Sequence, residues 1–125
     1  MFQISGIQHA SFIVADLDSA VDFYHGVLGM TLLPDRPDLG YPGAWLQAGQ
    51  QQIHLLQLPN PDPVEDRPQH GGRDRHVAFG IRDLTSLVEM LKTAGITYTL
   101  SRSGRRALFC RDPDGNALEF IEEAG

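Results

Sequence analysis

HASFIVADLDSAVDFY, at residues 9–24, reads much like HVAFGIRDLTSLVEML, at residues 76–91. Each stretch opens with a histidine in a β-rich alternating run, passes through Asp-Leu, and continues with apolar residues at helical spacing. The residues that coincide at an offset of 67 positions are His9 with His76, Phe12 with Phe79, Asp16 with Asp83, Leu17 with Leu84, Ser19 with Ser86 and Val21 with Val88. The chain is therefore a duplication of one strand–helix unit.

The ends of the two halves also match. QQIHLLQ (residues 51–57) lies over NALEFIE (residues 116–122), which places His54 on Glu119. A single strand histidine is more often hydrogen-bonded than bound to metal, but matching positions in two related units favour one shared site. We predict one divalent metal ion (Ni, Co, Zn, Mn or Fe) held by His9, His54, His76 and Glu119. His54 either ligates the ion or only lines the site.

The spacing of apolar residues predicts the same order of elements in each half. In the first half, we expect strands over 7–14, 30–33, 44–48 and 52–58, with a helix that begins after Asp16 and ends at Gly29. In the second half, we expect strands over 74–81, 96–100, 105–111 and 116–122, with a helix between Asp83 and Gly95. The segment 59–73 holds four prolines and reads as a linker. Each half is therefore βαβββ.

These elements predict an α+β fold. Residues 1–125 would form one domain, with module one at about 4–58 and module two at 74–122. A helix covers only one face of each sheet, so we expect the two open faces to meet as a cupped, half-open barrel. Strand residues alternate between faces. The residues that this alternation places in the cup near the predicted ligands are Ser11, Gln52, Arg105 and Phe109, our predicted substrate contacts.

Composition narrows the function classes. The chain is 42% hydrophobic and 21% charged with a net charge of −6, which speaks against nucleic acid or an anionic membrane as partner. It has no 18-residue apolar run and no visible signal peptide. The single cysteine, Cys110, fits a reducing cytoplasm, and we expect it on the outside of the sheet. We expect His25 and His70 to be solvated.

The run Asp-Pro-Asp-Gly-Asn-Ala-Leu-Glu-Phe at 112–120, with the strand-borne His9 and His76, resembles the vicinal oxygen chelate superfamily. Its members include glyoxalase I, methylmalonyl-CoA epimerase, extradiol dioxygenases, fosfomycin-modifying transferases and bleomycin-binding proteins. The resemblance extends from about residue 7 to 122 and implies that His9, His76 and Glu119 are the common metal triad. His54 stands where glyoxalase I has a glutamate and the epimerase a glutamine.

The resemblance implies a metal-dependent lyase or isomerase of the glyoxalase type. The ion would act as a Lewis acid on a substrate with neighbouring oxygens, and Glu119 would be the base. Arg105 and Arg106, or Arg73 and Arg75, could bind a substrate carboxylate or thiol-conjugate tail. Two alternatives stay open: an Fe(II) extradiol-type dioxygenase with His54 beside the triad, and a non-catalytic module that binds a small molecule. We also expect a homodimer, whose cup forms within one chain or between two.

Overall fold

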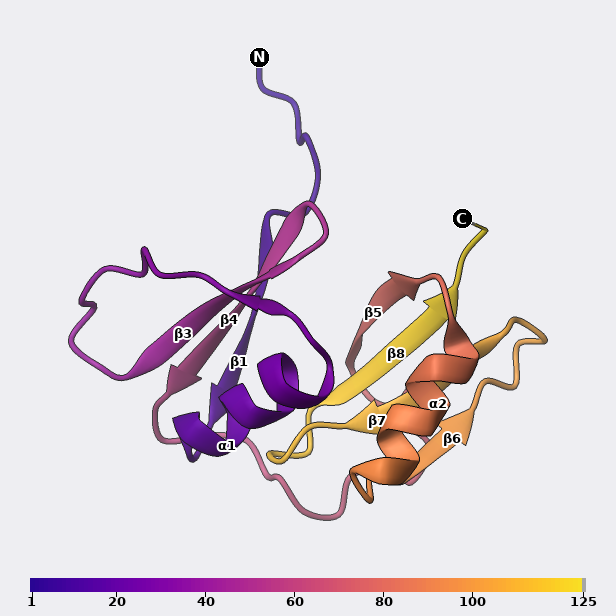
Figure 1. The fold of residues 1–125 in the computed structure, drawn as a ribbon. Helices are drawn as coiled ribbons and strands as arrows, with labels where there is room; N and C mark the ends of the chain where they lie inside the picture. Colours follow the sequence, from indigo (N-terminus) through magenta and orange to yellow (C-terminus); the bar gives the residue numbers. More distant parts are fainter. Residues whose placement is uncertain (125) are drawn as a thin grey trace. The chain divides into compact units, whose positions relative to one another are not determined.

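The structure is a computed structural model that describes residues 1–124 (Figure 1). By contacts between Cα atoms the chain divides into two compact units, Met1–Asn60 and 61–124. Segment 61–73, part of the predicted linker 59–73, lies in the second unit. Among the described residues, none of the helices combines the length and hydropathy that a bilayer crossing requires.

The first unit is a four-stranded mixed sheet with a helical segment. Its elements are β1 (His9–Val14), α1 (Leu17–Val21), the π-helix η1 (Asp22–Val27), β2 (Thr31–Leu32), β3 (Gly43–Ala48) and β4 (Gln51–Gln57). The strand order is β1-β4-β3-β2. β1 runs parallel to β4, whereas β3 is antiparallel to both of its neighbours. The first and last strands of the unit are therefore adjacent.

The second unit repeats this connectivity. Its elements are the 3₁₀ helix η2 (Gly71–Arg73), β5 (His76–Ile81), α2 (Leu84–Thr93), β6 (Tyr98–Leu100), β7 (Ala107–Arg111) and β8 (Ala117–Glu122). The strand order is β5-β8-β7-β6, with β5 parallel to β8 and the other pairs antiparallel. The predicted α+β fold of two tandem βαβββ modules is confirmed. The cupped barrel stays a prediction.

The duplication extends to the helix caps. Asp16 accepts hydrogen bonds from the backbone nitrogens of Asp18 and Ser19, and Asp83 accepts one from Ser86. The last strand of each unit adds a second cap. The Gln57 side chain accepts from the Leu17 nitrogen at 2.8 Å, and that of Glu122 accepts from the Leu84 nitrogen at 2.9 Å. These bonds satisfy donors that every helix start leaves open, and they fix each helix to its sheet.

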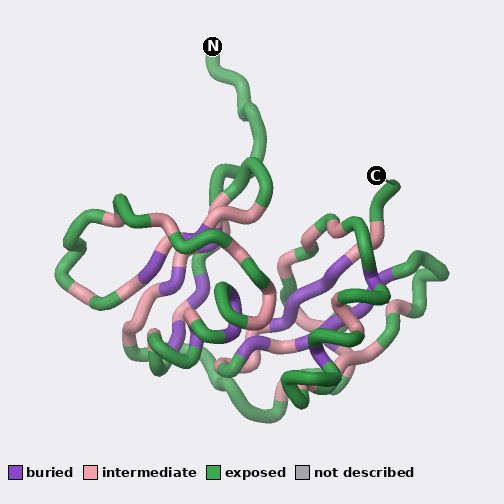
Figure 2. Tube along the Cα trace, viewed as in Figure 1, coloured by how far each residue is buried: buried purple, intermediate pink, exposed green. Residues whose placement is uncertain are grey.

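Along β1 and β4, buried core residues alternate with more exposed residues, which include the predicted ligands His9 and His54. In β1, Phe12 and Val14 are buried, whereas His9 and Ser11 are exposed. In β4, Ile53 and Leu55 are buried, and His54 between them is only half-buried. Figure 2 shows the buried residues following the strands of each unit, with exposed residues in the loops. The largest fully buried side chains are Tyr24, Leu46, Leu55, Leu91, Leu108, Leu118 and Val14.

The first helix departs from prediction in its second half. The expected α-helix becomes a π-helix, in which the Leu28 nitrogen donates to the Phe23 carbonyl five residues earlier. Its predicted end is confirmed, since Gly29 and Gly95 follow their helices with φ of 76° and 70°. Glycine is favoured there because that backbone region crowds a Cβ atom.

Candidate functional site

Two of the predicted ligands in the second unit lie side by side. His76 opens β5, and Glu119 lies in the middle of the parallel neighbour β8. The His76 Nε2 atom is 3.2 Å from Glu119 Oε1. The Glu119 side chain is 4% exposed and that of His76 27% exposed. The carboxylate is therefore almost fully shielded from water, and the more exposed imidazole lies beside it.

The other ring nitrogen of His76, Nδ1, fixes the orientation of the ring. Nδ1 lies 2.9 Å from the backbone carbonyl oxygen of Asp74. A carbonyl can only accept, so Nδ1 donates to it and Nε2 is the ring nitrogen that faces Glu119; when the ring is neutral, Nε2 holds the lone pair. Metal-binding histidines commonly donate their second N–H in this way. The pair thus offers two lone-pair donors to a cation.

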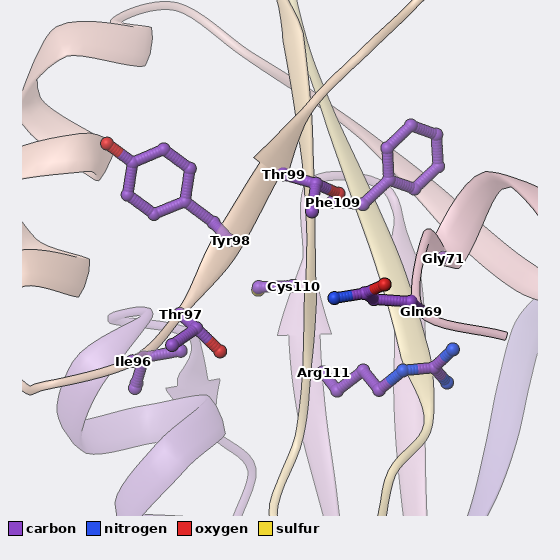
Figure 3. A pocket seen from close by; sticks show the side chains of 9 residues that line it. All are labelled: Gln69, Gly71, Ile96, Thr97, Tyr98, Thr99, Phe109, Cys110 and Arg111. Atoms are coloured by element: carbon purple, nitrogen blue, oxygen red, sulfur yellow. The ribbon is translucent and has the colours of Figure 1, made fainter. Parts of the chain in front are cut away.

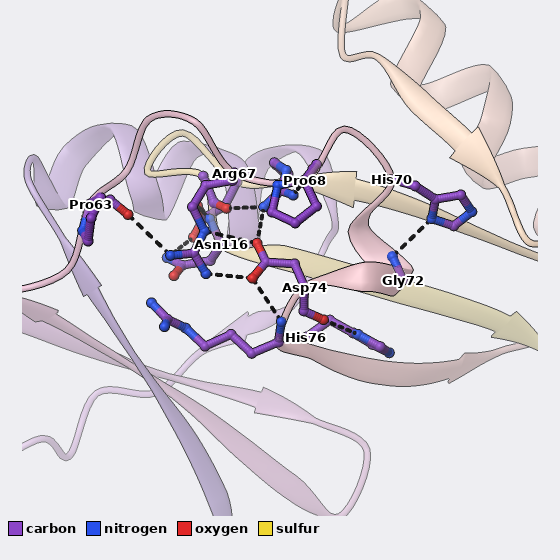
Figure 4. Close-up of polar contacts among 12 residues, drawn as sticks. Pro63, Arg67, Pro68, His70, Gly72, Asp74, His76 and Asn116 are labelled. Carbon is purple, nitrogen blue, oxygen red and sulfur yellow. Dashed lines mark hydrogen bonds and ion pairs between the residues drawn. The ribbon is translucent and has the colours of Figure 1, made fainter.

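Asp74 is itself held by an ion-pair network at the start of β5. Its carboxylate accepts from Arg67 Nε at 3.0 Å and from Arg111 Nη1 at 2.8 Å (Figure 4). The hydrogen bond from Arg67, and after it that from Arg111, holds the pKa of Asp74 well below its usual range. The network joins segment 61–73 to β7 and fixes the chain just before His76.

One cation already contacts the acidic ligand. The Nη2 atom of Arg105, which lies just before β7, is 3.4 Å from Glu119 Oε2. The neighbouring arginines have other partners: Arg106 pairs with Glu122 at 2.6 Å and Arg75 with Asp62 at 3.1 Å. Within the described residues, Arg75, Arg105 and Arg106 each form an ion pair. Arg105 is the one of these three whose partner is a predicted metal ligand.

The two histidines of the first unit are stacked. The His9 and His54 ring centroids are 3.9 Å apart at an interplanar angle of 15°. Trp45 covers the other face of His54, with centroids 4.4 Å apart at 11°. Stacked rings present faces rather than lone pairs to each other. His9, at the exposed start of β1, must therefore turn before both imidazoles can share an ion.

His54 is kept in its neutral form. Burial, the neighbouring His9 and the Arg36 guanidinium all lower the pKa of His54 from its usual value of 6.5. The ring is thus mostly unprotonated at neutral pH, which is the form that binds metals. Its Nε2 atom lies 2.9 Å from Gln52 Oε1. Gln52, a predicted substrate contact, thus contacts a predicted ligand.

The other two predicted substrate contacts lie near the same pairs. Ser11 is exposed on β1, opposite His54 in the strand register. Phe109 on β7 is opposite Glu119, and its ring meets the His76 ring edge-on with centroids 5.2 Å apart. Phe109 and Glu119 therefore lie on the same face of the second sheet, while the cup position and the substrate-binding role of Phe109 stay predictions.

Two aromatic partners were not predicted. A two-residue turn at Gly49 and Gln50 joins β3 to β4, and the resulting register places Trp45 opposite His54. His70 was predicted to be solvated, but it is half-buried: its Nδ1 accepts from the Gly72 nitrogen and its ring packs against Phe109 at 4.9 Å. The reason is the short η2 helix, which His70 caps. His25 is exposed, as predicted.

The described residues contain no cluster of three or more His, Cys, Asp or Glu side chains that could hold a metal. Each unit instead supplies one pair, and both pairs have the donor chemistry of a divalent site. His76 Nε2 and Glu119 Oε1, 3.2 Å apart, are close enough to share one ion, whereas the stacked rings of His9 and His54 are not arranged to do so. Cys110 takes no part: it is buried, and burial, with a smaller effect of Asp112, raises its pKa to about 12.

Comparison with known proteins decides the family. The sequence profile of the Glyoxalase/Bleomycin resistance protein/Dioxygenase superfamily matches residues 6–120. The chain belongs to this superfamily. Within it, the lactoylglutathione lyase of Haemophilus influenzae is 32% identical over 125 residues, which cover 93% of this chain and 91% of that protein.

Solved structures in the superfamily share the fold. A glyoxalase family protein from Bacillus anthracis superposes with a TM-score of 0.82 at 26% identity, covering 99% of each chain. A variant of the fosfomycin resistance protein FosX from Listeria monocytogenes, complexed with Mn(II), has a TM-score of 0.78 at 19% identity, covering 98% of this chain and 95% of that one. Neither likeness identifies the substrate of this chain.

Proposed function

We propose that this chain is a divalent-metal-dependent lyase or isomerase of the glyoxalase type, acting on a small substrate that binds the ion through neighbouring oxygens. The observation that carries this proposal is the contact of His76 Nε2 with Glu119 Oε1, made while Nδ1 is anchored on a carbonyl. Either a proton or a metal ion between Nε2 and Oε1 makes this contact favourable, and a divalent ion is the occupant that we propose. The 32% identity to a lactoylglutathione lyase supports the reaction class.

The residues that would hold the ion are His9, His54, His76 and Glu119. His76 and Glu119 already face each other, and His54 is kept neutral by its surroundings. When bound, the ion supplies Lewis acidity to two substrate oxygens and so makes the carbon next to them more acidic. Three imidazoles and one carboxylate leave the site more positive than a set with two carboxylates would.

Glu119 would move the proton, since it is the one carboxylate of the four. Its side chain is 4% exposed, so bulk water has little access to the carboxylate oxygens. One oxygen faces His76 and the other faces Arg105. With an ion taking over the charge balance, Arg105 would be released to donate to a substrate oxygen. Ser11, Gln52 and Phe109 would complete the walls of the site.

We propose a homodimer as the working unit. Each four-stranded sheet ends in two edge strands, and the edge strands β2 and β6 carry the exposed leucines Leu32 and Leu100. Such edges are normally covered or blocked, and a symmetric dimer covers them. The predicted linker of 15 residues reaches roughly 50 Å when extended, which allows a site within one chain or between two.

The test is the metal content of protein purified without chelator, followed by turnover. Hemithioacetals of 2-oxoaldehydes with small thiols are the expected substrates, and catechols test the Fe(II) dioxygenase alternative. We expect thiol-adduct turnover that disappears on metal removal and returns with Ni or Co. Metal-dependent ring cleavage of a catechol would replace the proposal by the dioxygenase. Absence of metal affinity would leave the non-catalytic binding protein.

A further inference from the structure

A cleft of about 400 Å³ opens beside the His76–Glu119 pair, entirely within the second unit (Figure 3). Segment 69–71 lies along one side, and strands β6 and β7 supply the other. The residues that line it are Gln69, Gly71, Ile96, Thr97, Tyr98, Thr99, Phe109, Cys110 and Arg111. Of the residues assigned to the reaction centre above, Phe109 is the one that also lines this cleft.

Apart from Arg111, the polar side chains that line the cleft are uncharged. Thr99 is opposite Phe109 in the strand register, so both side chains lie on the same face of the sheet. Figure 3 shows the Gln69 amide and the Thr99 hydroxyl near Phe109, while the Tyr98 ring points away from them. Within residues 1–124, the side chains of Gln69, Thr97 and Thr99 form no hydrogen bond. They are free to bind a ligand.

The one charged residue of the cleft is already engaged. Arg111 Nη1 donates to Asp74 at 2.8 Å and to the Gly115 carbonyl at 2.7 Å, and its Nη2 donates to the Pro68 carbonyl. A ligand carboxylate entering the cleft would therefore lose water without gaining an unengaged cation. A ligand amide or hydroxyl would find partners in Gln69 and Thr99.

The cleft is continuous with the reaction centre through one side chain. Phe109 lines the cleft and also packs edge-on against His76, 5.2 Å between centroids. His70 holds the other side of the same ring at 4.9 Å. The tail of a molecule whose reacting oxygens lie at His76 and Glu119 would therefore lie next to the Phe109 wall of the cleft.

We propose that this cleft binds the non-reacting tail of the substrate, and that this tail is uncharged and carries amide or hydroxyl groups. The inference rests on the proposed function for the reaction centre, because it assigns the tail of that same substrate. Its recognition would come from Thr97, Thr99 and Gln69, with Phe109 packing against the apolar part of the tail.

The test uses two small thioethers of similar size on the metal-free protein. N-[2-(methylthio)ethyl]acetamide carries a neutral amide, and 3-(methylthio)propanoate carries a carboxylate. In ¹H–¹⁵N correlation spectra we expect the amide probe to shift the backbone signals of Gln69, Gly71, Thr99 and Cys110, with a lower Kd than the propanoate. Thr99→Val and Gln69→Ala should each raise that Kd about three- to tenfold, as the loss of one hydrogen bond does. Thr93→Val, at the exposed end of α2 and outside the cleft, should leave it unchanged.

The proposal is overturned if the amide probe shifts none of these signals, if both probes bind equally well, or if the Thr99 and Gln69 variants behave like Thr93→Val. The result is separable from that for the metal site, because the titration contains no metal. Cleft binding without metal affinity would refute the proposed function alone. Metal affinity without cleft binding would refute only this inference.

Discussion

His76 Nε2 and Glu119 Oε1 face each other at 3.2 Å across the neighbouring parallel strands β5 and β8. Because Nδ1 of the same ring donates to the Asp74 carbonyl, Nε2 is the nitrogen that is directed at the carboxylate. The contact is favourable when a proton or a metal ion lies between the two atoms. The contact therefore leads to a specific chemical expectation, which is a cation between these two atoms.

Arg105 should compete with metal for Glu119. Its guanidinium is 3.4 Å from the carboxylate, but its side chain is 57% exposed, so solvent screens the interaction. We expect Arg105→Gln to tighten divalent-metal binding by about two- to fivefold, the worth of an exposed ion pair. Calorimetric titration with Ni²⁺ measures this change. Arg106→Gln, which removes the partner of Glu122 instead, is the control. Weaker metal binding in Arg105→Gln would show that Arg105 supports the site rather than competing for it.

Asp74 should matter for stability far more than Asp62. The Asp74 side chain is 7% exposed and pairs with Arg67 and Arg111, whereas Asp62 and its partner Arg75 are 53% and 64% exposed. We expect Asp74→Ala to lower the free energy of unfolding by about 3 kcal/mol, because it leaves partly buried guanidinium groups unpaired. Asp62→Ala should change it by less than about 1 kcal/mol. Urea unfolding measures both, and equal effects would contradict the network.

The same carboxylate gives a pH dependence. Its pKa is lowered on folding by Arg67 and then by Arg111, so its contribution is fully present above the ordinary aspartate pKa of about 4. The contribution is lost as the pH falls further toward the folded-state pKa. The stability gap between wild type and Asp74→Ala should therefore shrink below pH 4. A gap that is constant down to pH 2 would contradict this assignment.

The roles of Glu119 and His54 should separate in activity. We expect Glu119→Gln to abolish turnover even at saturating metal, because it removes the one carboxylate that can take the proton. His54→Gln should keep measurable turnover and mainly change metal preference, since an amide can still line or bind the ion. Steady-state kinetics across Ni, Co, Zn and Mn measures both. The reverse pattern would assign the base to His54.

A homodimer is expected at micromolar concentration, and sedimentation velocity measures it. Two full-length variants, His9→Ala/His54→Ala and His76→Ala/Glu119→Gln, then locate the site when they are refolded together. If each site takes one pair from each chain, the mixed dimer regains one intact metal site. If both pairs belong to one chain, mixing restores none. A protein that sediments only as monomer would contradict the dimer.

Local signals predicted most of the fold. Asp16 and Asp83 were identified as caps because a capping carboxylate binds nitrogens only two or three residues away. The buried faces of β1 and β4 followed from alternation along the strand, whereas the first four residues of β8 are all buried. The π-helix from Asp22 to Val27 was not predicted, because one wider turn leaves the apolar positions of Tyr24 and Leu28 compatible with an α-helix.

Contacts between residues that are distant in the sequence were harder to predict. The stacking of Trp45 on His54 depends on the length of the turn between β3 and β4. A predicted strand end that is wrong by one residue therefore moves Trp45 out of register with His54. The η2 helix and its cap His70 lie in a proline-rich segment whose periodicity is uninformative. The sequence named both Arg105 and Arg106 as candidates, and only the side-chain contacts show that Arg105 pairs with Glu119 and Arg106 with Glu122.

The central claim is that His9, His54, His76 and Glu119 hold one divalent ion. Its most direct measurement is a calorimetric titration of metal-free protein with Ni²⁺, repeated on His9→Ala, His76→Ala and Glu119→Gln. His25→Ala, which removes an exposed histidine outside both pairs, is the matched control. The account predicts one ion per chain for wild type and His25→Ala, with affinity reduced beyond roughly 100-fold in the other three, more than loss of an outer-shell partner costs. Unchanged affinity in His76→Ala and Glu119→Gln would contradict it.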